Sequence, residues 1–248
     1  MRAHRVRALL MGGQACVFYG AAEFSRDTDF AILADSANLA RLRRALSELQ
    51  AEPIAVPPLE LRFLRRGHAI HFRCHHPEAS RMRVDLMARM RGVSSFAALW
   101  RRRTAIELEP GTRCDLLALP DLVQAKKTQR DKDWPMIRRL VEAHYFQYRD
   151  HSPGSPASPP LARRGGSAAQ VRFWLRELRT PELLIEVAQA KPASCLRLLG
   201  LRPLLAHAAS GDAAALERAL RAEEDAERDR DRQYWLPLRR ELQDLRHR

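Results

Sequence analysis

Apolar and polar residues alternate with two different periods along the first 150 residues. Short apolar runs are typical of sheet strands, and they cover residues 7–11, 27–33, 59–64, 69–74 and 83–87. Leu39, Leu42 and Leu46 follow helical spacing, which predicts an amphipathic helix over residues 38–50 with Ser36 available as its N-cap. Helices are also predicted over residues 14–22, 96–102 and 119–148. The fold class expected from this mixture is α/β (α+β), a small mixed β-sheet flanked by helices.

A Pro/Gly/Ser-rich stretch at residues 151–167 interrupts these patterns. Such a composition does not build helix or sheet, so a linker is expected there. Beyond it, helices are predicted over residues 168–178, 181–190, 193–199, 213–230 and 234–245. The expected organisation is therefore a domain over residues 1–150, a linker over 151–167 and a helical C-terminal segment over 168–248.

Composition narrows the setting of the chain. No apolar run approaches the roughly 18–20 residues of a membrane helix, and the basic start has no long apolar segment behind it. The four cysteines are scattered without metal-site spacing, which favours reduced thiols. We therefore expect a cytoplasmic protein that does not span a membrane.

The net charge of +13 is compatible with a nucleic-acid partner, since basic side chains neutralise phosphates. Arginine dominates this charge, because the chain has only four lysines, and a GC-rich coding sequence produces the same skew. A nucleic-acid partner therefore remains one alternative among several.

Three acidic residues carry the candidate chemistry. Asp27 and Asp29 are two residues apart at the start of an expected strand, so both side chains should leave the same face. Two carboxylates this close repel each other unless a cation lies between them, and hard oxygen ligands suit Mg²⁺ or Mn²⁺ bound together with phosphates. Asp85, in another expected strand, is the natural third ligand.

A glycine pair supplies the other half of a phosphate site. Gly12 and Gly13 end the first expected strand and lead into a helix, where backbone N–H groups can approach phosphate oxygens closely. Taken alone, the pair is also compatible with an ordinary tight turn, as the acidic pair is with a polar turn.

The spacing of these residues resembles a known signature. Gly12-Gly13, thirteen intervening residues and Asp27-Thr28-Asp29-Phe30 are similar to the signature of the DNA polymerase β nucleotidyltransferase superfamily. The small bacterial branch, with toxin- and antitoxin-like members and aminoglycoside-modifying enzymes, often has a Ser or Thr where Ser25 stands. The resemblance covers residues 5–147 and departs at Glu23, where many relatives carry arginine.

This resemblance implies roles for individual residues. Asp27, Asp29 and Asp85 would hold Mg²⁺ or Mn²⁺, and Asp85 would also act as base on the acceptor hydroxyl. Gly12, Gly13 and Ser25 would bind the phosphates of a nucleoside triphosphate such as ATP, and Lys126 would neutralise the triphosphate tail. The implied reaction is transfer of a nucleoside monophosphate to a hydroxyl of an RNA, a protein or a small molecule, with a toxin or antitoxin as a candidate partner.

Alternatives remain open at several points. The same fold could serve as a binding module without turnover, such as an antitoxin or an RNA-binding subunit. Only one of the adjacent Lys126 and Lys127 should face a nucleotide, and Arg130 with Asp133 fits a structural ion pair at least as well as a substrate contact. The cluster of His68, His71, Cys74, His75 and His76 is expected to be structural rather than a zinc site.

Overall fold

The structure, a computed structural model, describes residues 1–149 and 167–247. The chain forms two compact units, one of Met1–Lys126 with Asp231–Arg248 and the other of Lys127–Arg230. Helix α6 (Asp133–Tyr148) belongs to the same unit as the later helix α7 (Ala168–Glu177), against which it packs. The linker expected over residues 151–167 lies outside the described residues except for Ser167, so the domain division expected there stays a prediction.

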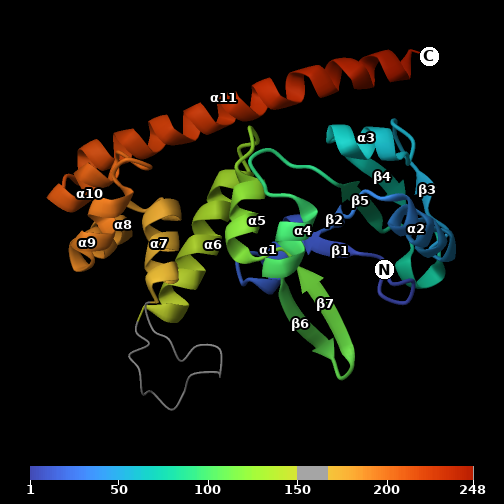
Figure 1. Cartoon of the computed structure of the whole chain (residues 1–248), viewed down its shortest axis with the longest axis horizontal. Helices are drawn as coiled ribbons and strands as arrows, with labels where there is room; N and C mark the ends of the chain where they lie inside the picture. The colour runs from blue at the N-terminus through green and yellow to red at the C-terminus, as the bar shows by residue number, and fades with distance from the viewer. Residues whose placement is uncertain (150–166, 248) are drawn as a thin grey trace. The chain divides into compact units, whose positions relative to one another are not determined.

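Seven strands among the described residues form one mixed sheet in the first unit, in the order β3–β4–β5–β2–β1–β7–β6 (Figure 1). In chain order the strands are β1 (Ala8–Met11), β2 (Asp27–Ile32), β3 (Glu52–Pro53), β4 (Ile70–Arg73), β5 (Arg83–Met87), β6 (Thr104–Glu109) and β7 (Thr112–Leu116). Strand β2 runs parallel to β5 and antiparallel to β1. With helices beside this sheet, the α/β class expected from the sequence is confirmed.

Helices of the first unit cover the sheet and connect its strands. They are α1 (Gly12–Phe18), α2 (Ser36–Glu48), α3 (Leu61–Arg66), the short 3₁₀ helix η1 (Pro77–Ala79), α4 (Phe96–Arg102), α5 (Leu119–Lys126) and the end of α11 (Ala213–Arg246). The apolar face of α2 packs with α3 and with β4 and β5 in one buried core. The N-cap of α2 is Asp35 rather than Ser36, because the Asp35 side chain accepts a 2.6 Å hydrogen bond from the backbone N–H of Asn38.

Asn38 ties the sheet to this helix layer. Its buried side chain accepts a hydrogen bond from the N–H of Arg7 at 2.7 Å and donates to the carbonyls of Arg7 and Leu33 at 3.1 and 2.9 Å. These bonds fix the beginning of β1 and the end of β2. The opposite ends of these two strands, where Gly12 and Asp27 lie, are thereby held in register.

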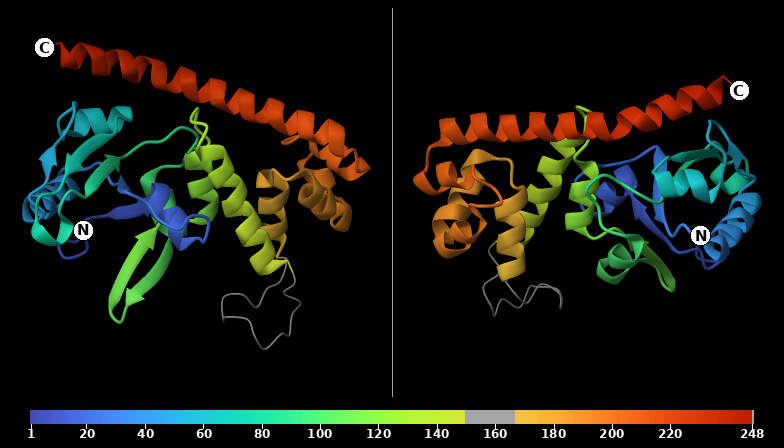
Figure 2. Two further views of the ribbon diagram at one scale, coloured as in Figure 1. Left: turned by 180° about the vertical axis from the view of Figure 1, so that it is seen from behind. Right: turned by 45° about the horizontal axis from the view of Figure 1, so that its top comes forward.

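Two parts of the first unit differ from the sequence pattern. The alternation over residues 59–64 predicts a strand, but α3 occupies this region, because Phe63 and Leu64 are both buried side by side and Gly67 ends the helix at a φ of 111°. No element is expected between residues 103 and 118, yet β6 and β7 form a hairpin there around Gly111, and it projects away from the other strands (Figure 2).

The second unit is helical in the residues described. It contains α6, α7, α8 (Pro181–Ala190), α9 (Pro192–Leu198), α10 (Leu205–Ser210) and the first part of α11. The helix predicted over residues 119–148 is divided into α5 and α6, whereas the two predicted over 213–230 and 234–245 are a single helix, α11. Asp231, Arg232 and Gln233 are polar but compatible with a helix, so the loss of apolar periodicity there does not end it. No helix in either described range is both long and apolar enough to cross a membrane.

Candidate active site

One face of the sheet gathers the three predicted carboxylates. In the β2–β5 pair, Asp29 lies opposite Asp85 and Asp27 lies opposite Arg83. Cross-strand partners project from the same face, so the three acids share it. In the β4–β5 pair, His71 lies opposite Asp85, which extends the row to His71, Asp85 and Asp29.

The strict alternation of β4 and β5 explains why these polar residues share a face. The intervening residues Ile70, Phe72, Val84 and Leu86 point the other way and are buried in the core with α2 and α3. Burial of this apolar face fixes the register of the strands, since a slip by one residue would bury the charged side chains. The position of Asp85 beside Asp29 is therefore a consequence of the core on the opposite face.

Gly12 brings the backbone against Asp29. Its φ is +66°, and a Cβ atom built on it would lie 1.8 Å from Oδ2 of Asp29. Gly13 has a similar relationship with Ser25, whose Oγ would lie 2.5 Å from a Cβ at position 13. Ser25 in turn donates a 3.0 Å hydrogen bond to the carbonyl of Asp27. The structure thus brings Gly12, Gly13 and Ser25 together with Asp27 and Asp29.

Asp85 is held by two basic side chains. Arg83 donates from Nε to Oδ1 at 2.8 Å and from Nη2 to Oδ2 at 3.0 Å, and His71 Nδ1 lies 2.8 Å from Oδ1. Burial raises the pKa of Asp85, but the hydrogen bonds from His71 and Arg83 outweigh it, and the pKa lies below its ordinary value. The Asp85 side chain is only 13% exposed and is a carboxylate at neutral pH.

The position of Lys126 relative to the three aspartates is less closely defined. Lys126 is the last residue of α5, which packs against α1, and it is half-buried. Its role at the triphosphate stays a prediction. The neighbouring Lys127 belongs to the second unit, where its Nζ lies 2.8 Å from Oε2 of Glu177.

Arg130 forms the structural ion pair that the sequence allows. Its Nε donates to Oδ2 of the buried Asp133 at 2.8 Å, and the hydroxyl of Thr128 donates to the same oxygen at 2.6 Å. The Arg130–Asp133 contact therefore stabilises the start of α6.

The donor set can be compared with the needs of a divalent cation. Three carboxylates share one face, two are direct cross-strand neighbours, and Gly12 leaves room against Asp29 that a side chain would fill. Hard oxygen ligands of this kind fit Mg²⁺ or Mn²⁺. As the side chains stand, no three His, Cys, Asp or Glu residues within the described part of the chain form a metal-holding group. In this arrangement Arg83 contacts both oxygens of Asp85.

Arg83 and His71 are residues that the sequence reasoning did not place at this site. Arg83 precedes Asp85 by two positions in a strand, so the period of the strand alone puts both on one face. His71 was not detectable in this way, because its contact with Asp85 depends on the pairing of β4 with β5.

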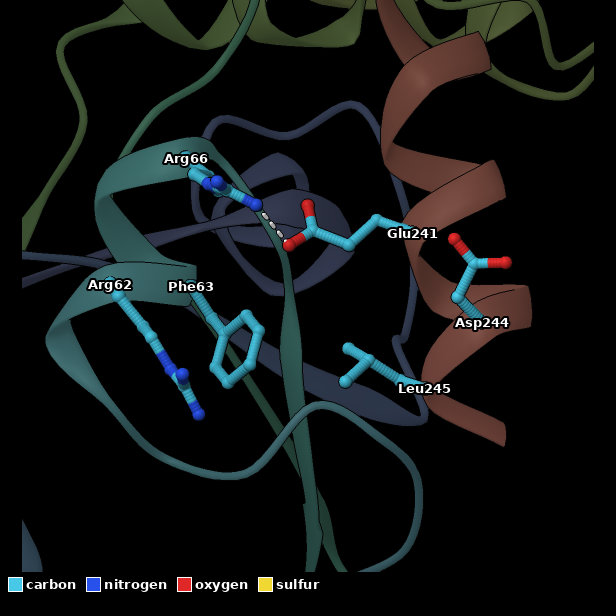
Figure 3. A pocket seen from close by; sticks show the side chains of 6 residues that line it. All are labelled: Arg62, Phe63, Arg66, Glu241, Asp244 and Leu245. Atoms are coloured by element: carbon cyan, nitrogen blue, oxygen red, sulfur yellow. Dashed lines mark hydrogen bonds and ion pairs between the residues drawn. The ribbon is translucent and has the colours of Figure 1, made fainter. Parts of the chain in front are cut away.

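A separate hollow of about 310 Å³ lies between α3 and the end of α11 (Figure 3). It is lined by Arg62, Phe63, Arg66, Glu241, Asp244 and Leu245. Glu241 bridges the two helices, since it pairs with Arg66 and lies 2.8 Å from Nε2 of the buried His68. None of the three aspartates lines this hollow, which is built around an ion pair that fastens α11 to α3.

Comparison of the sequence with known protein families and curated proteins identifies no relative of this chain. No protein-family model matches the chain, and a search of curated proteins finds no similar sequence.

Proposed function

We propose that this chain is a metal-dependent nucleotidyltransferase, which transfers a nucleoside monophosphate from a nucleoside triphosphate to an acceptor hydroxyl. The observation that carries the proposal is the cross-strand pairing of Asp29 with Asp85, with Asp27 on the same face and the backbone of Gly12 against Asp29. These residues come from three separate stretches of sequence, and the resemblance to polymerase β-like nucleotidyltransferases implies that such residues share one site.

Asp27, Asp29 and Asp85 would hold Mg²⁺ or Mn²⁺, which when bound supplies positive charge to the phosphates and to the attacking oxygen. In the reaction, a bond forms between the acceptor oxygen and the α-phosphorus, and the bond from that phosphorus to the bridging oxygen of the β-phosphate breaks. Pyrophosphate leaves with the electron pair, and the acceptor hydroxyl loses its proton.

Asp85 would accept that proton, but only after a change in its contacts. While Arg83 and His71 bind its carboxylate, the lowered pKa makes it a weak base. Ser25 likewise donates its hydroxyl proton to the carbonyl of Asp27, so this bond must open before Ser25 can donate to a phosphate. Gly12 and Gly13 would contribute backbone N–H groups, and Lys126 a positive charge for the triphosphate tail.

The test is pyrophosphate release by the full chain. Purified protein is incubated with Mg²⁺ and each nucleoside triphosphate in turn, with and without total RNA. We expect release that is lost in Asp29→Asn and retained in Asp244→Asn, a matched change away from the sheet. Release that continues unchanged in Asp29→Asn would overturn the assignment of this site.

A second candidate is a binding module with the same fold but no turnover, such as an RNA-binding or antitoxin subunit. The observation that favours it is the ion pair of Arg83 with Asp85, which satisfies the third carboxylate without a cation. In this case pyrophosphate release would be absent with every triphosphate, and RNA retention would be unaffected by Asp27→Ala or Asp29→Ala. RNA, a protein hydroxyl and an aminoglycoside-like molecule remain the candidate acceptors if turnover is found.

A further inference from the structure

The contact between Arg83 and Asp85 uses both oxygens of the carboxylate. Arg83 binds Oδ1 through Nε at 2.8 Å and Oδ2 through Nη2 at 3.0 Å, which is the bidentate geometry of the strongest arginine–carboxylate pairs. His71 Nδ1 also lies 2.8 Å from Oδ1. Both oxygens of Asp85 are therefore already in contact with a basic side chain, so a cation at Asp85 would have to compete with these contacts.

Arg83 is under the influence of all three acids. It forms an ion pair with Asp85, and the charges of Asp27 and Asp29 also act on its guanidinium. Arg83 is also the cross-strand partner of Asp27. The guanidinium thus supplies, at this face, the positive charge that the acids would otherwise take from a cation.

The Arg83 side chain has access to solvent, into which it can move when it leaves Asp85. Its side chain is 38% exposed, whereas that of Asp85 is 13% exposed. Release of the guanidinium would therefore expose it to water rather than bury an unpaired charge, which keeps the cost of the movement low. Asp85 would keep its contact with His71 at Oδ1, while Oδ2 would become available beside Asp29, and the two like charges favour a cation there.

We propose that Arg83 is a built-in competitor of the divalent cation for Asp85, so that the cation binds only as Arg83 gives up the carboxylate. The proposal rests on the proposed function, because the cation site is the same one. Arg83 is a positioning residue in this scheme. It holds Asp85 in place in the absence of the cation and limits the affinity of the site for the metal alone.

The test measures Mn²⁺ binding to the full chain by electron paramagnetic resonance, without any nucleotide. We expect the Arg83→Gln variant to bind Mn²⁺ about tenfold more tightly than the wild type, because the variant has no ion pair with Asp85 that must be broken first. A tenfold change in affinity corresponds to about 1.4 kcal/mol. Arg83→Lys keeps the charge but not the two-point contact and should lie between them. Asp85→Asn should bind more weakly than the wild type.

Arg73 provides the matched control. It is the cross-strand neighbour of Arg83 on β4, faces the same side and is exposed. Arg73→Gln removes one positive charge from this face without removing a contact that the structure shows with Asp85, and it should change the Mn²⁺ affinity by less than about twofold. A gain equal to that of Arg83→Gln would reduce the effect to general electrostatics and overturn the proposal. Circular dichroism of each variant checks that the fold is intact.

The outcomes separate this proposal from the proposed function. If the wild type binds Mn²⁺ and Arg83→Gln binds it equally or less tightly, the competition is refuted while the cation site stands. If neither protein binds Mn²⁺, both the competition and the metal-dependent function fail. Binding that is detected only in Arg83→Gln would support the competition directly.

Discussion

The backbone at Gly12 lies so close to Asp29 that a Cβ atom at position 12 would be 1.8 Å from Oδ2. This approach places the end of β1 against the acid at the centre of the candidate site. Because the residue also has a φ of +66°, both the conformation and the space at position 12 call for glycine.

Gly12→Ala should therefore destabilise the protein by two separate effects. The positive φ costs about 1 kcal/mol, and the overlap with Asp29 adds at least about 1 kcal/mol more. Gly111→Ala is the matched control, since its φ is +80° but no other atom of residues 1–149 and 167–247 lies in contact with the added Cβ. Urea unfolding measures both variants, and equal losses of unfolding free energy would show that the contact with Asp29 adds nothing.

His144 should make the stability of the second unit depend on pH above the range of the carboxylates. Its ring accepts a 2.9 Å hydrogen bond from Nε1 of Trp174, and burial lowers its pKa to about 4. The unfolded chain takes up a proton near pH 6.5, which the folded chain resists until about pH 4, so stability falls as the pH is lowered through this window. The loss is at most about 3 kcal/mol.

His144→Gln separates this effect from other titrations. Glutamine can still accept the hydrogen bond from Trp174 but has no proton to gain. Thermal unfolding between pH 6.5 and pH 4.5 should show a smaller decrease for the variant than for the wild type. Parallel curves for the two proteins would contradict the role of His144.

Arg202 should be a major stabilising residue of the second unit. It is buried and donates to both carboxylate oxygens of Glu223, to the carbonyl of Leu175 at 2.8 Å and to that of Leu178 at 3.0 Å. Lysine keeps the charge but cannot reach these acceptors together, so Arg202→Lys should reduce the free energy of unfolding by about 2 kcal/mol.

The control for Arg202 is Arg221→Lys. The Arg221 side chain is 76% exposed and pairs with Glu217 one turn away, so the change should cost less than about 0.5 kcal/mol. Urea unfolding curves of the two variants decide between a specific and a general effect of replacing arginine.

Glu241 should fasten the end of α11 to α3. It pairs with Arg66 (Figure 3). It also pairs with the fully buried His68, whose Nδ1 has no hydrogen-bond partner among the described residues. Glu241→Ala would leave His68 without this bond, and amide hydrogen exchange in residues 231–246 should become about tenfold faster. Asp244→Ala changes a neighbouring acid of the same hollow and should leave the exchange nearly unchanged. Equal rates in the two variants would rule out a specific role of Glu241.

The local pattern of apolar and polar residues predicted the strands and the turn that hold most of the candidate site residues. The apolar runs at residues 27–33 and 83–87 predicted the strands that hold Asp27, Asp29 and Asp85, and the Gly-Gly turn was predicted from Gly12 and Gly13. These features depend on the chain within a few residues, where the period of a strand and the conformational freedom of glycine dominate. The mixed α/β class followed from the same periods.

Tertiary structure decided which of these residues meet. The pairing of Asp29 with Asp85, the contact of His71 and Arg83 with Asp85, and the helix in place of a strand at residues 61–66 all depend on how the core of α2, α3, β4 and β5 is packed. Register and burial are set by contacts between residues far apart in the chain, so a local period cannot specify them. The order of residues along each strand specifies the chemical groups and the faces they occupy. The packing of the apolar core determined their neighbours, including the arginine that now binds the third carboxylate.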